Sequence, residues 1–354
     1  MDNKPTNKGL KSNSRIQGTF MNMTGRSRIE SIGSYVPEDV VTSEELMAEI
    51  HAEERFGVPN SWLEELTGIR ARRFAGPNAK PSDLAIEAGR AALEKCGMDP
   101  ASIGMVIYCG IDRDWVEPAT SHRIQRELGC NNASCLDVTN ACHGFTNGMS
   151  IGDAMIATGA TENVLVVTGE VPSHVALDCI ADINKNPTNE NFKGKVGGLT
   201  TGDAGGAVIL QRASSESGVK SYRFASQGRY AELCYYKFDE DGKRCGQMLM
   251  DKISAAALYM HKSLISETYK SLSWQPSDID YLICHQAGRK PHQRFAELAE
   301  VDISKAPVTY ENLGNLTSAS IPVTLDLAGS EKGDRVLILG TGSGLSVSQI
   351  GLVI

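Results

Sequence analysis

The sequence predicts an α/β fold made of two related halves, and two observations support this. Segments with apolar residues at helical spacing alternate along the chain with short apolar runs of the kind found in buried strands. Two of these strand segments also recur in the same order in the second half of the chain. Regular alternation of helices and strands favours a sheet that is covered by helices on both faces.

The first half contains two predicted helix–strand units. Residues 82–96 (SDLAIEAGRAALEKC) have the helical pattern, and after a turn with Pro100 the apolar run 105–110 (MVIYCG) predicts a strand. Residues 147–159 predict a second helix, and a second strand follows over 163–169 (NVLVVTG). Both strands are almost entirely apolar, so we expect them to be buried.

The second half repeats this arrangement. Residues 100–107 (PASIGMVI) line up with 276–283 (PSDIDYLI), and residues 163–169 line up with 335–341 (RVLILGT) at nearly the same offset. A chance match of short apolar strands is the alternative explanation. The common order of both pairs favours two related halves that pack together.

The repeat and the composition together suggest where the parts of the chain begin and end. We expect a flexible leader over residues 1–26, a first half over 27–212 and a second half over 213–354. The run from 182 to 201 is rich in Asn, Lys and Glu and has few apolar residues. It is expected to form a surface loop or a lid-like insertion, and a simple solvated loop is the preferred interpretation.

The composition excludes several classes of protein. With 41% hydrophobic and 22% charged residues, the 354-residue chain is typical of a globular protein and not of a disordered or fibrous one. Its net charge of -8 argues against a nucleic-acid partner. No apolar run is long enough for a membrane span, and the N-terminal residues lack the apolar core of a secretory signal, which favours a cytoplasmic location. The nine cysteines lack CxxC spacing, so we expect reduced, mostly buried thiols and no metal site.

Cys142 is the candidate nucleophile. It lies in the segment 135–149 (CLDVTNACHGFTNGM), where an apolar strand ends and a turn of small residues leads into a helix. Unpaired N–H groups and the positive end of the dipole at a helix N-terminus favour a thiolate, which is the form that attacks a thioester carbonyl. The alternative is a buried structural cysteine.

His285 and Asn315 are candidate partners of this cysteine. His285 ends a buried strand in the second half, and Asn315 lies in a polar turn before a helix, in a position that corresponds to that of Cys142 in the first half. If the halves are pseudo-symmetric, the three side chains converge at their interface. Histidine and asparagine side chains can both donate hydrogen bonds to a developing oxyanion. Each residue alone is more often structural, so the hypothesis depends on all three.

The glycine-rich run 340–344 (GTGSG) follows a predicted strand and superficially matches a dinucleotide fingerprint. Only ten residues follow it, so no βαβ unit can be completed. We therefore interpret it as a tight turn that brings backbone N–H groups, those of Ser343 and Gly344, close to the site.

Segments along nearly the whole chain after the leader resemble the thiolase superfamily, and within it the ketoacyl-acyl-carrier-protein synthase III (FabH-like) group. The matching segments are 66–73 (LTGIRARR), 137–145 (DVTNACHGF), 201–207 (TGDAGGA), 285–287 (HQA), 314–322 (GNLTSASIP) and 340–344. The resemblance implies a thiolase fold with five layers (αβαβα) and two pseudo-symmetric halves, a homodimer, and a Cys-His-Asn site at the bottom of an acyl tunnel. It also implies acyl-CoA or an acyl carrier protein as substrate or partner, and no cofactor.

One segment narrows the resemblance. Residues 112–120 (DRDWVEPAT) are similar to the OleA-type enzymes that begin a long-chain olefin pathway, and to ketosynthases that form α-pyrones. In those families the glutamate before the proline enters the site of the partner subunit and acts as a base on a second acyl chain. Glu117 is the matching residue, and a surface or helix-capping glutamate is the alternative.

Two positions depart from the pattern of the fatty-acid-initiating synthases. Those enzymes usually have an arginine where this chain has Leu66 and an asparagine where it has Gly288, so the resemblance does not extend to their mode of holding coenzyme A. Trp62 matches a residue that stacks on the coenzyme. Candidates for phosphate contacts are Arg72, Arg73, Arg289 and Lys290, with a solvated basic surface as the common alternative.

These observations predict an acyl-condensing enzyme that works through an acyl-Cys142 intermediate. In a non-decarboxylative Claisen condensation, Glu117 would deprotonate the second acyl chain, and head-to-head joining would give a β-keto product. Decarboxylative condensation with a malonyl thioester is the first alternative, since it needs no glutamate base. An acyltransferase and a non-catalytic partner subunit are further alternatives.

Overall fold

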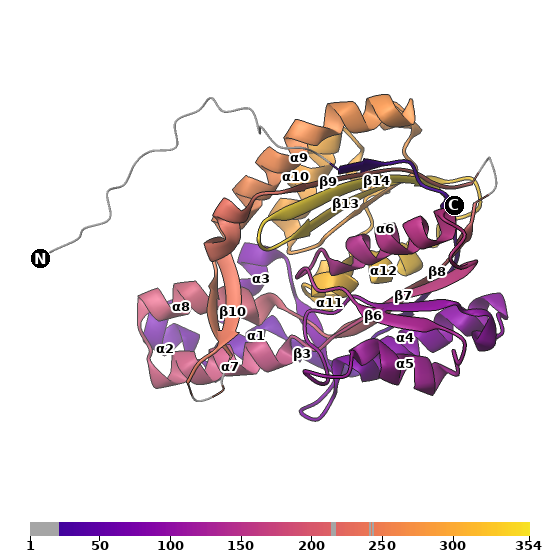
Figure 1. The fold of residues 1–354 in the computed structure, drawn as a ribbon. Coiled ribbons are helices and arrows are strands. Elements are labelled where there is room, and N and C mark those ends of the chain that lie inside the picture. Colours follow the sequence, from indigo (N-terminus) through magenta and orange to yellow (C-terminus); the bar gives the residue numbers. More distant parts are fainter. Residues whose placement is uncertain (1–20, 214–216, 241, 243) are drawn as a thin grey trace, which may run out of the picture.

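Two five-stranded sheets form the framework of the protein, whose computed structural model describes residues 21–354 except 214–216, 241 and 243 (Figure 1). In the first sheet the strand order is β2 (Ser27–Tyr35), β8 (Ala204–Arg212), β7 (Asn163–Glu170), β5 (Met105–Tyr108) and β6 (Ser134–Asp137). In the second sheet the strand order is β1 (Met21–Met23), β9 (Gly218–Ser226), β14 (Ser346–Val353), β13 (Arg335–Gly342) and β12 (Tyr281–Cys284).

The two sheets confirm the predicted repeat. The order β2-β8-β7-β5 in the first corresponds to β9-β14-β13-β12 in the second, and in each only the last two of these strands are parallel to one another. Short 3-10 helices that begin at Pro100 and Pro276 precede β5 and β12. The strands that lined up in the sequence therefore occupy equivalent places.

One helix from each half fills the space between the sheets. These helices are α6 (Gly144–Ala157) and α12 (Ser320–Leu327), and their apolar side chains join the largest core cluster with side chains from both sheets (Figure 1). A glycine at every fourth position lets α6 lie directly on its sheet. A Cβ at Gly144 would lie 2.5 Å from the carbonyl oxygen of Cys109, and one at Gly148 would lie 2.2 Å from its sulfur.

The outer faces of the sheets are also covered by helices. The first sheet carries α4 (Pro81–Cys96) and α5 (Thr120–Leu128), and the second carries α9 (Met250–Leu272) and α10 (Arg289–Ala299) (Figure 1). The layers therefore follow the order αβαβα, as predicted. Because helices cover both faces of each sheet, the central strands have continuous apolar sequences and do not alternate between apolar and polar residues.

A helical lobe lies beside the sheets and corrects the prediction for residues 182–201. The lobe contains α1 (Ser43–Glu49), α2 (Ala52–Phe56), α3 (Trp62–Thr67), α7 (Ser173–Lys185), α8 (Asn189–Lys195) and the 3-10 helix Val196–Thr200. The expected loop is therefore mostly helical. The Thr188 side chain accepts a hydrogen bond from the backbone of Asn191 and caps α8, and Phe192 is buried against Phe56 and Trp62.

The remaining elements complete the surface around the sheets. β3 (Asp39–Thr42) pairs with β4 (Ala71–Phe74), β10 (Cys234–Phe238) pairs with β11 (Arg244–Met248), and α11 (Tyr310–Leu313) is a single turn. Residues 1–20 of the expected leader lie outside the described residues. Met21–Met23, which we assigned to the leader, instead form β1 and extend the second sheet by pairing with β9.

The nine cysteines are unpaired, and only four of them are fully buried, fewer than expected. Among the described residues, no helix combines the length and the apolar character needed to cross a membrane.

Candidate active site

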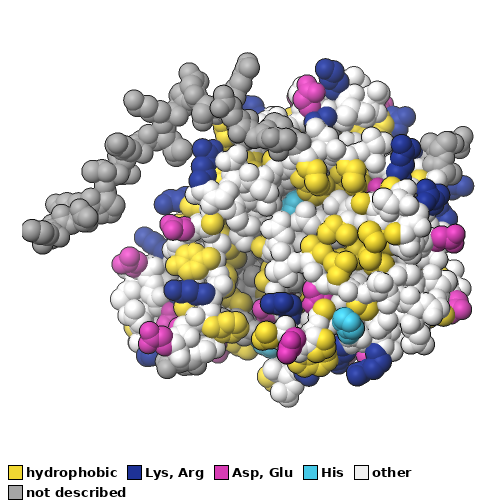
Figure 2. Space-filling model, in the orientation of Figure 1, with side chains coloured by type: hydrophobic (Ala, Val, Ile, Leu, Met, Phe, Trp, Pro, Cys, Tyr) yellow, Lys and Arg dark blue, Asp and Glu magenta, His cyan; other side chains and the backbone are white. Residues whose placement is uncertain are grey.

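A cavity of about 270 Å³ between the two halves is lined by Cys142, His285 and Asn315. Apolar side chains from several elements complete its wall, namely Leu66, Met248, Met250, Ile253, Ala257 and Phe295. Figure 2 shows that one face of the molecule is hollowed between the helical lobe and the body of the sheets, with hydrophobic side chains beside the hollow. The cavity can thus hold an apolar chain next to a small polar cluster.

Cys142 is placed by the turn that connects β6 to α6. Ala141 adopts a positive φ of 47°, and α6 begins two residues after the cysteine, at Gly144. Burial raises the pKa of the Cys142 thiol well above its usual range, and the nearby Cys234 and Glu170 add to this effect. The expected thiolate is therefore not the resting form. Desolvation outweighs the helix end, so the thiol needs a base when it attacks.

His285 lies at the end of β12 and can supply such a base. Its backbone N–H donates to the carbonyl of Leu339 over 3.0 Å, which fixes the residue at the edge of the second sheet. Burial lowers the pKa of His285 to about 4, and a backbone hydrogen bond to Thr317 opposes this shift only in part. The buried Nδ1 makes no hydrogen bond within the described part of the chain. A neutral imidazole of this kind can accept a proton from a thiol.

Asn315 is held by residues of the first half. Its N–H donates to the carbonyl of Thr200 over 2.8 Å, and its own carbonyl accepts from the N–H of Gly202 over 3.1 Å. The side-chain Oδ1 accepts from the N–H of Thr317 over 3.0 Å. Because the oxygen is engaged in this way, the assigned orientation leaves the amide NH2 group as the donor toward the cavity.

The glycine-rich turn joins the antiparallel strands β13 and β14 and lies against the cysteine segment. Thr341, Gly342 and Ser343 line the cavity, whereas Gly344 does not. A Cβ at Gly342 would lie 2.7 Å from both the backbone nitrogen and the Cβ of His143. Only glycine therefore allows this close approach, as expected for a turn that presents its backbone to the site.

The cavity mouth carries basic side chains from the start of α10. Arg289 and Lys290, the candidates for phosphate contacts, are exposed there, and the nearby exposed Arg294 also lines the cavity. Arg294 was missed, although its spacing of four residues from Lys290 places both on one helix face. The two departures from the synthase pattern, Leu66 and Gly288, line the same cavity.

Besides Gly344, four predicted site residues do not line this cavity, namely Glu117, Trp62, Arg73 and Arg72. Glu117 is exposed on the loop between β5 and α5. Trp62 packs against Phe192 with ring centroids 5.5 Å apart, one helical turn before Leu66. Arg73 donates to the carbonyl of Glu38 over 2.9 Å.

Arg72 requires a correction. It is fully buried and donates hydrogen bonds to the carbonyls of Val41 and Leu199 and to the hydroxyl of Ser43. Its guanidinium group therefore joins β3 to two segments of the lobe and is not presented to a phosphate.

Two buried polar residues near the site were not predicted. Glu170 ends β7 and accepts hydrogen bonds from the N–H of Ile111 and the hydroxyl of Thr168, both over 3.1 Å. Burial raises the pKa of Glu170 to about 8. His143 bonds through Nδ1 to Asn147 over 2.9 Å, and burial lowers its pKa to about 4. Glu170 could have been found from the sequence, because it is a glutamate at the end of the mostly apolar strand β7. No group of three metal-binding side chains occurs among the residues that the structure describes.

Comparisons with known proteins agree with this fold and site. A family model described as 3-oxoacyl-[acyl-carrier-protein (ACP)] synthase III matches residues 136–228, and the model of the C-terminal part of that synthase matches residues 270–352. The solved structure of cerulenin-bound OleA from Xanthomonas campestris has 25% sequence identity and a TM-score of 0.85, covering 94% of this chain and 98% of that one.

Two further OleA structures from Xanthomonas campestris are similar. A Cys-to-Ser variant with bound lauric acid and lauroyl-CoA has 25% identity and a TM-score of 0.85, covering 94% of this chain and 100% of that one. A His-to-Ala variant has 25% identity and a TM-score of 0.84, covering 93% and 98%.

The five-layered fold and a cavity that places a cysteine beside a histidine and an asparagine define a condensing enzyme of the thiolase type. The chain belongs to the thiolase superfamily, in its 3-oxoacyl-ACP synthase III (FabH-like) group. It is an acyltransferase of the ketosynthase type that acts on acyl thioesters.

Proposed function

We propose that this enzyme joins two acyl chains head to head by a non-decarboxylative Claisen condensation. The observation that carries the proposal is the convergence of Cys142, His285 and Asn315 on one largely apolar cavity with a basic mouth. The substrate is an acyl thioester of coenzyme A or of a carrier protein. Exposed Arg289, Lys290 and Arg294 suit the phosphates of either carrier.

The first half-reaction loads the enzyme. Neutral His285 accepts the thiol proton of Cys142 as the sulfur attacks the thioester carbonyl. The carbonyl oxygen becomes an oxyanion, for which the N–H of Cys142 and the turn at Gly342 and Ser343 supply backbone donors. The carrier thiolate then leaves and takes the proton from His285, which becomes neutral again, and the acyl group remains on Cys142.

The second half-reaction forms the carbon–carbon bond. Glu117 of the second subunit in a homodimer removes a proton from the α-carbon of the incoming acyl thioester. The side chains of His285 and Asn315 stabilise the enolate oxygen. The α-carbon attacks the acyl-enzyme carbonyl, Cys142 leaves as a thiolate, and a β-keto thioester results. Glu117 then releases its proton and the Cys142 thiolate takes one up, which restores the resting enzyme. These steps use only protein side chains and backbone groups, so the proposed reaction requires no cofactor.

Support for this form of the reaction comes from the sequence and from the relatives. The segment with Glu117 is similar to OleA-type enzymes, and one solved OleA contains lauric acid and lauroyl-CoA. The exposed Glu117 lies outside the cavity of its own chain, which suits action on a second subunit. The name of the matching family model, a 3-oxoacyl-ACP synthase, favours the decarboxylative alternative. In that reaction a malonyl thioester generates its own carbanion, so no glutamate base is needed.

A substitution of Glu117 by glutamine separates the two reactions. With lauroyl-CoA as the only substrate, the Glu117→Gln variant should become acylated at Cys142 at the wild-type rate but form no β-keto product. Mass spectrometry of the intact protein and of the extracted lipid measures both steps. The Cys142→Ala variant is the control and should do neither. A Glu117→Gln variant that condenses at the wild-type rate would refute the proposed base.

A further inference from the structure

We propose that Asp114 and Arg123 are positioning residues that fix the base of the Glu117 loop (residues 110–119, between β5 and α5) so that Glu117 is held ready for the other subunit. This inference rests on the proposed function of Glu117. The loop has two distinct parts. Its tip is exposed, with Val116 93% and Trp115 39% accessible, whereas the side chain of Asp114 is fully buried.

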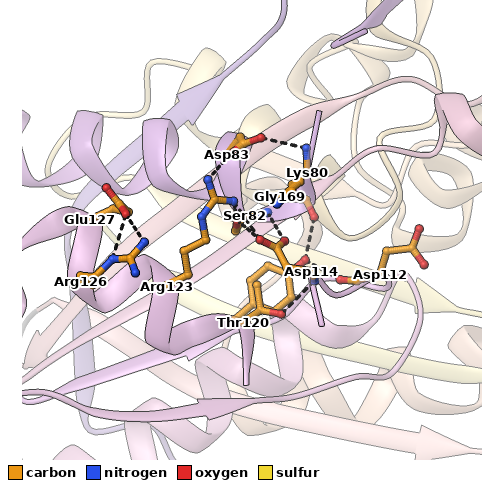
Figure 3. A network of polar contacts seen from close by, with 11 residues as sticks. Lys80, Ser82, Asp83, Asp112, Asp114, Thr120, Arg123, Arg126, Glu127 and Gly169 are labelled. Atoms are coloured by element: carbon orange, nitrogen blue, oxygen red, sulfur yellow. Dashed lines mark hydrogen bonds and ion pairs between the residues drawn. The ribbon is translucent and has the colours of Figure 1, made fainter. Parts of the chain in front are cut away.

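Asp114 is the centre of a polar network that ties the loop to α4 and α5 (Figure 3). Its carboxylate accepts from Arg123 over 2.8 Å, from the N–H of Ser82 over 3.2 Å and from the hydroxyl of Ser82 over 2.5 Å. Arg123 also forms an ion pair with Asp83 over 2.5 Å. Arg123, whose side chain is 19% accessible, therefore joins the loop to the start of α4 through two carboxylates.

Further hydrogen bonds fix the backbone on both sides of the tip. The hydroxyl of Tyr108 donates to the carbonyl of Asp112 over 2.7 Å, and the N–H of Ile111 donates to Glu170. After the tip, the N–H groups of Thr120 and Ser121 donate to Asp137 over 2.7 and 3.0 Å. Glu117 thus lies in a short span between two anchored points, Asp114 and Thr120.

The physics of a buried ion pair favours a positioning role for this network. Taking a carboxylate out of water is costly, and an apolar pair of similar size often stabilises a fold as well or better. What the charged pair adds is a defined geometry, because the planar guanidinium group satisfies its carboxylates in fixed directions. A catalytic base that must reach across a subunit interface depends on such geometry, since a displacement of about 1 Å can cost about 100-fold in rate.

The Asp114→Asn variant tests the proposal, because it keeps the side-chain shape and removes the charge. We expect Cys142 to be acylated by lauroyl-CoA at a rate within about twofold of wild type, with at least a tenfold loss in the kcat of condensation. The Arg123→Lys variant keeps the positive charge but loses the planar guanidinium group, and it should show an intermediate loss of condensation. It replaces Asp114→Asn in the test if that variant does not fold. Arg126→Gln is the matched control on the same helix: it removes an exposed ion pair with Glu127 that does not touch the loop, and should leave both steps unchanged.

Mixed dimers distinguish a positioning defect from a general one. Co-expression of Asp114→Asn and Cys142→Ala chains with different tags gives dimers in which the intact loop of one chain faces the intact Cys142 of the other. Condensation should recover in these dimers to about half of the wild-type rate per dimer. Equal loss of acylation and condensation, or no recovery in the mixed dimer, would overturn the proposal. If the Glu117→Gln variant condenses at the wild-type rate, the proposed role of Glu117 as the base is refuted. If Glu117→Gln loses condensation but Asp114→Asn and Arg123→Lys condense at the wild-type rate, only the positioning role of Asp114 and Arg123 is refuted.

Discussion

The reactivity of Cys142 is set by its surroundings more than by its position before a helix. Burial raises the pKa of its thiol, and the neighbouring Cys234 and Glu170 act in the same direction. The N-terminus of α6 would lower this pKa, but it does not compensate for the loss of hydration. In the proposed reaction, the thiol therefore becomes reactive only when neutral His285 accepts its proton.

A labelling experiment tests this protonation state. We expect the rate at which iodoacetamide alkylates Cys142 to rise continuously from about pH 7 to about pH 9, because the thiolate fraction grows about tenfold per unit below the pKa. Peptide mapping by mass spectrometry follows this residue separately from the other eight cysteines. A rate that reaches a plateau below about pH 8 would mean that the thiolate is already present at neutral pH.

Residue types at strand ends could be predicted from the sequence, but their burial could not. Cys142 and His285 each follow a short apolar strand, so the edge of a sheet was a reasonable place for both. Arg72 gave no such signal. Arg72 lies in a run of basic residues, which is also typical of a phosphate site. Only the packing of β4 against the lobe shows that its guanidinium group is internal. Tertiary packing decided between the two interpretations.

At the scale of elements, polarity alone misled the prediction for residues 182–201. The run is rich in Asn and Lys, yet Thr188 begins α8 as an N-cap and Phe192 supplies its single large apolar contact. One buried aromatic residue on a short helix gives almost no periodic signal. The helix is stabilised by its stacking on Phe56, which lies more than one hundred residues earlier in the chain.

Two glycines in different elements should respond oppositely to the same substitution. Gly342→Ala places a Cβ 2.7 Å from the backbone of His143 and should destabilise the protein by about 1–3 kcal/mol and slow Cys142 acylation. Gly194→Ala lies in α8 with no atom within 4 Å of the new Cβ, and should stabilise by about 0.5–1 kcal/mol. Urea unfolding of both variants measures the difference. Equal stability of Gly342→Ala and wild type would show that the turn does not pack against the cysteine segment.

At the scale of the whole molecule, duplication explains why the site lies where it does. The helices α6 and α12 occupy the same central layer, so the turns that precede them, with Cys142 and Asn315, meet between the sheets. The sequence repeat was sufficient to predict this meeting. It carried no information about the helical lobe or about the exposed position of the Glu117 loop.

Buried titratable groups make the unfolding free energy pass through a maximum as the pH changes. Buried histidines lower it on the acid side, and buried Glu170 lowers it on the alkaline side. Burial lowers the pKa of His143 and His285 to about 4 and that of His261 to about 3. Each is neutral in the folded protein, so its contribution is lost as pH falls below the unfolded value of about 6.5, at about 1.4 kcal/mol per pH unit. Glu170, whose pKa is about 8, is protonated when folded, and its contribution is lost as pH rises from about 4.5 through 8.

We therefore expect the unfolding free energy to be greatest near pH 6.5. Below this pH, the three histidines together lower the unfolding free energy, and Glu170 offsets only about a third of the loss. The unfolding free energy should therefore fall by about 3 kcal/mol per pH unit. Above it, Glu170 alone produces a shallower decline. Urea unfolding at about pH 5, 6.5 and 8 measures both limbs, and Glu170→Gln should flatten the alkaline one and leave the histidine effect in place. Equal stability at pH 5 and pH 6.5 would contradict a neutral, buried set of histidines in the interior.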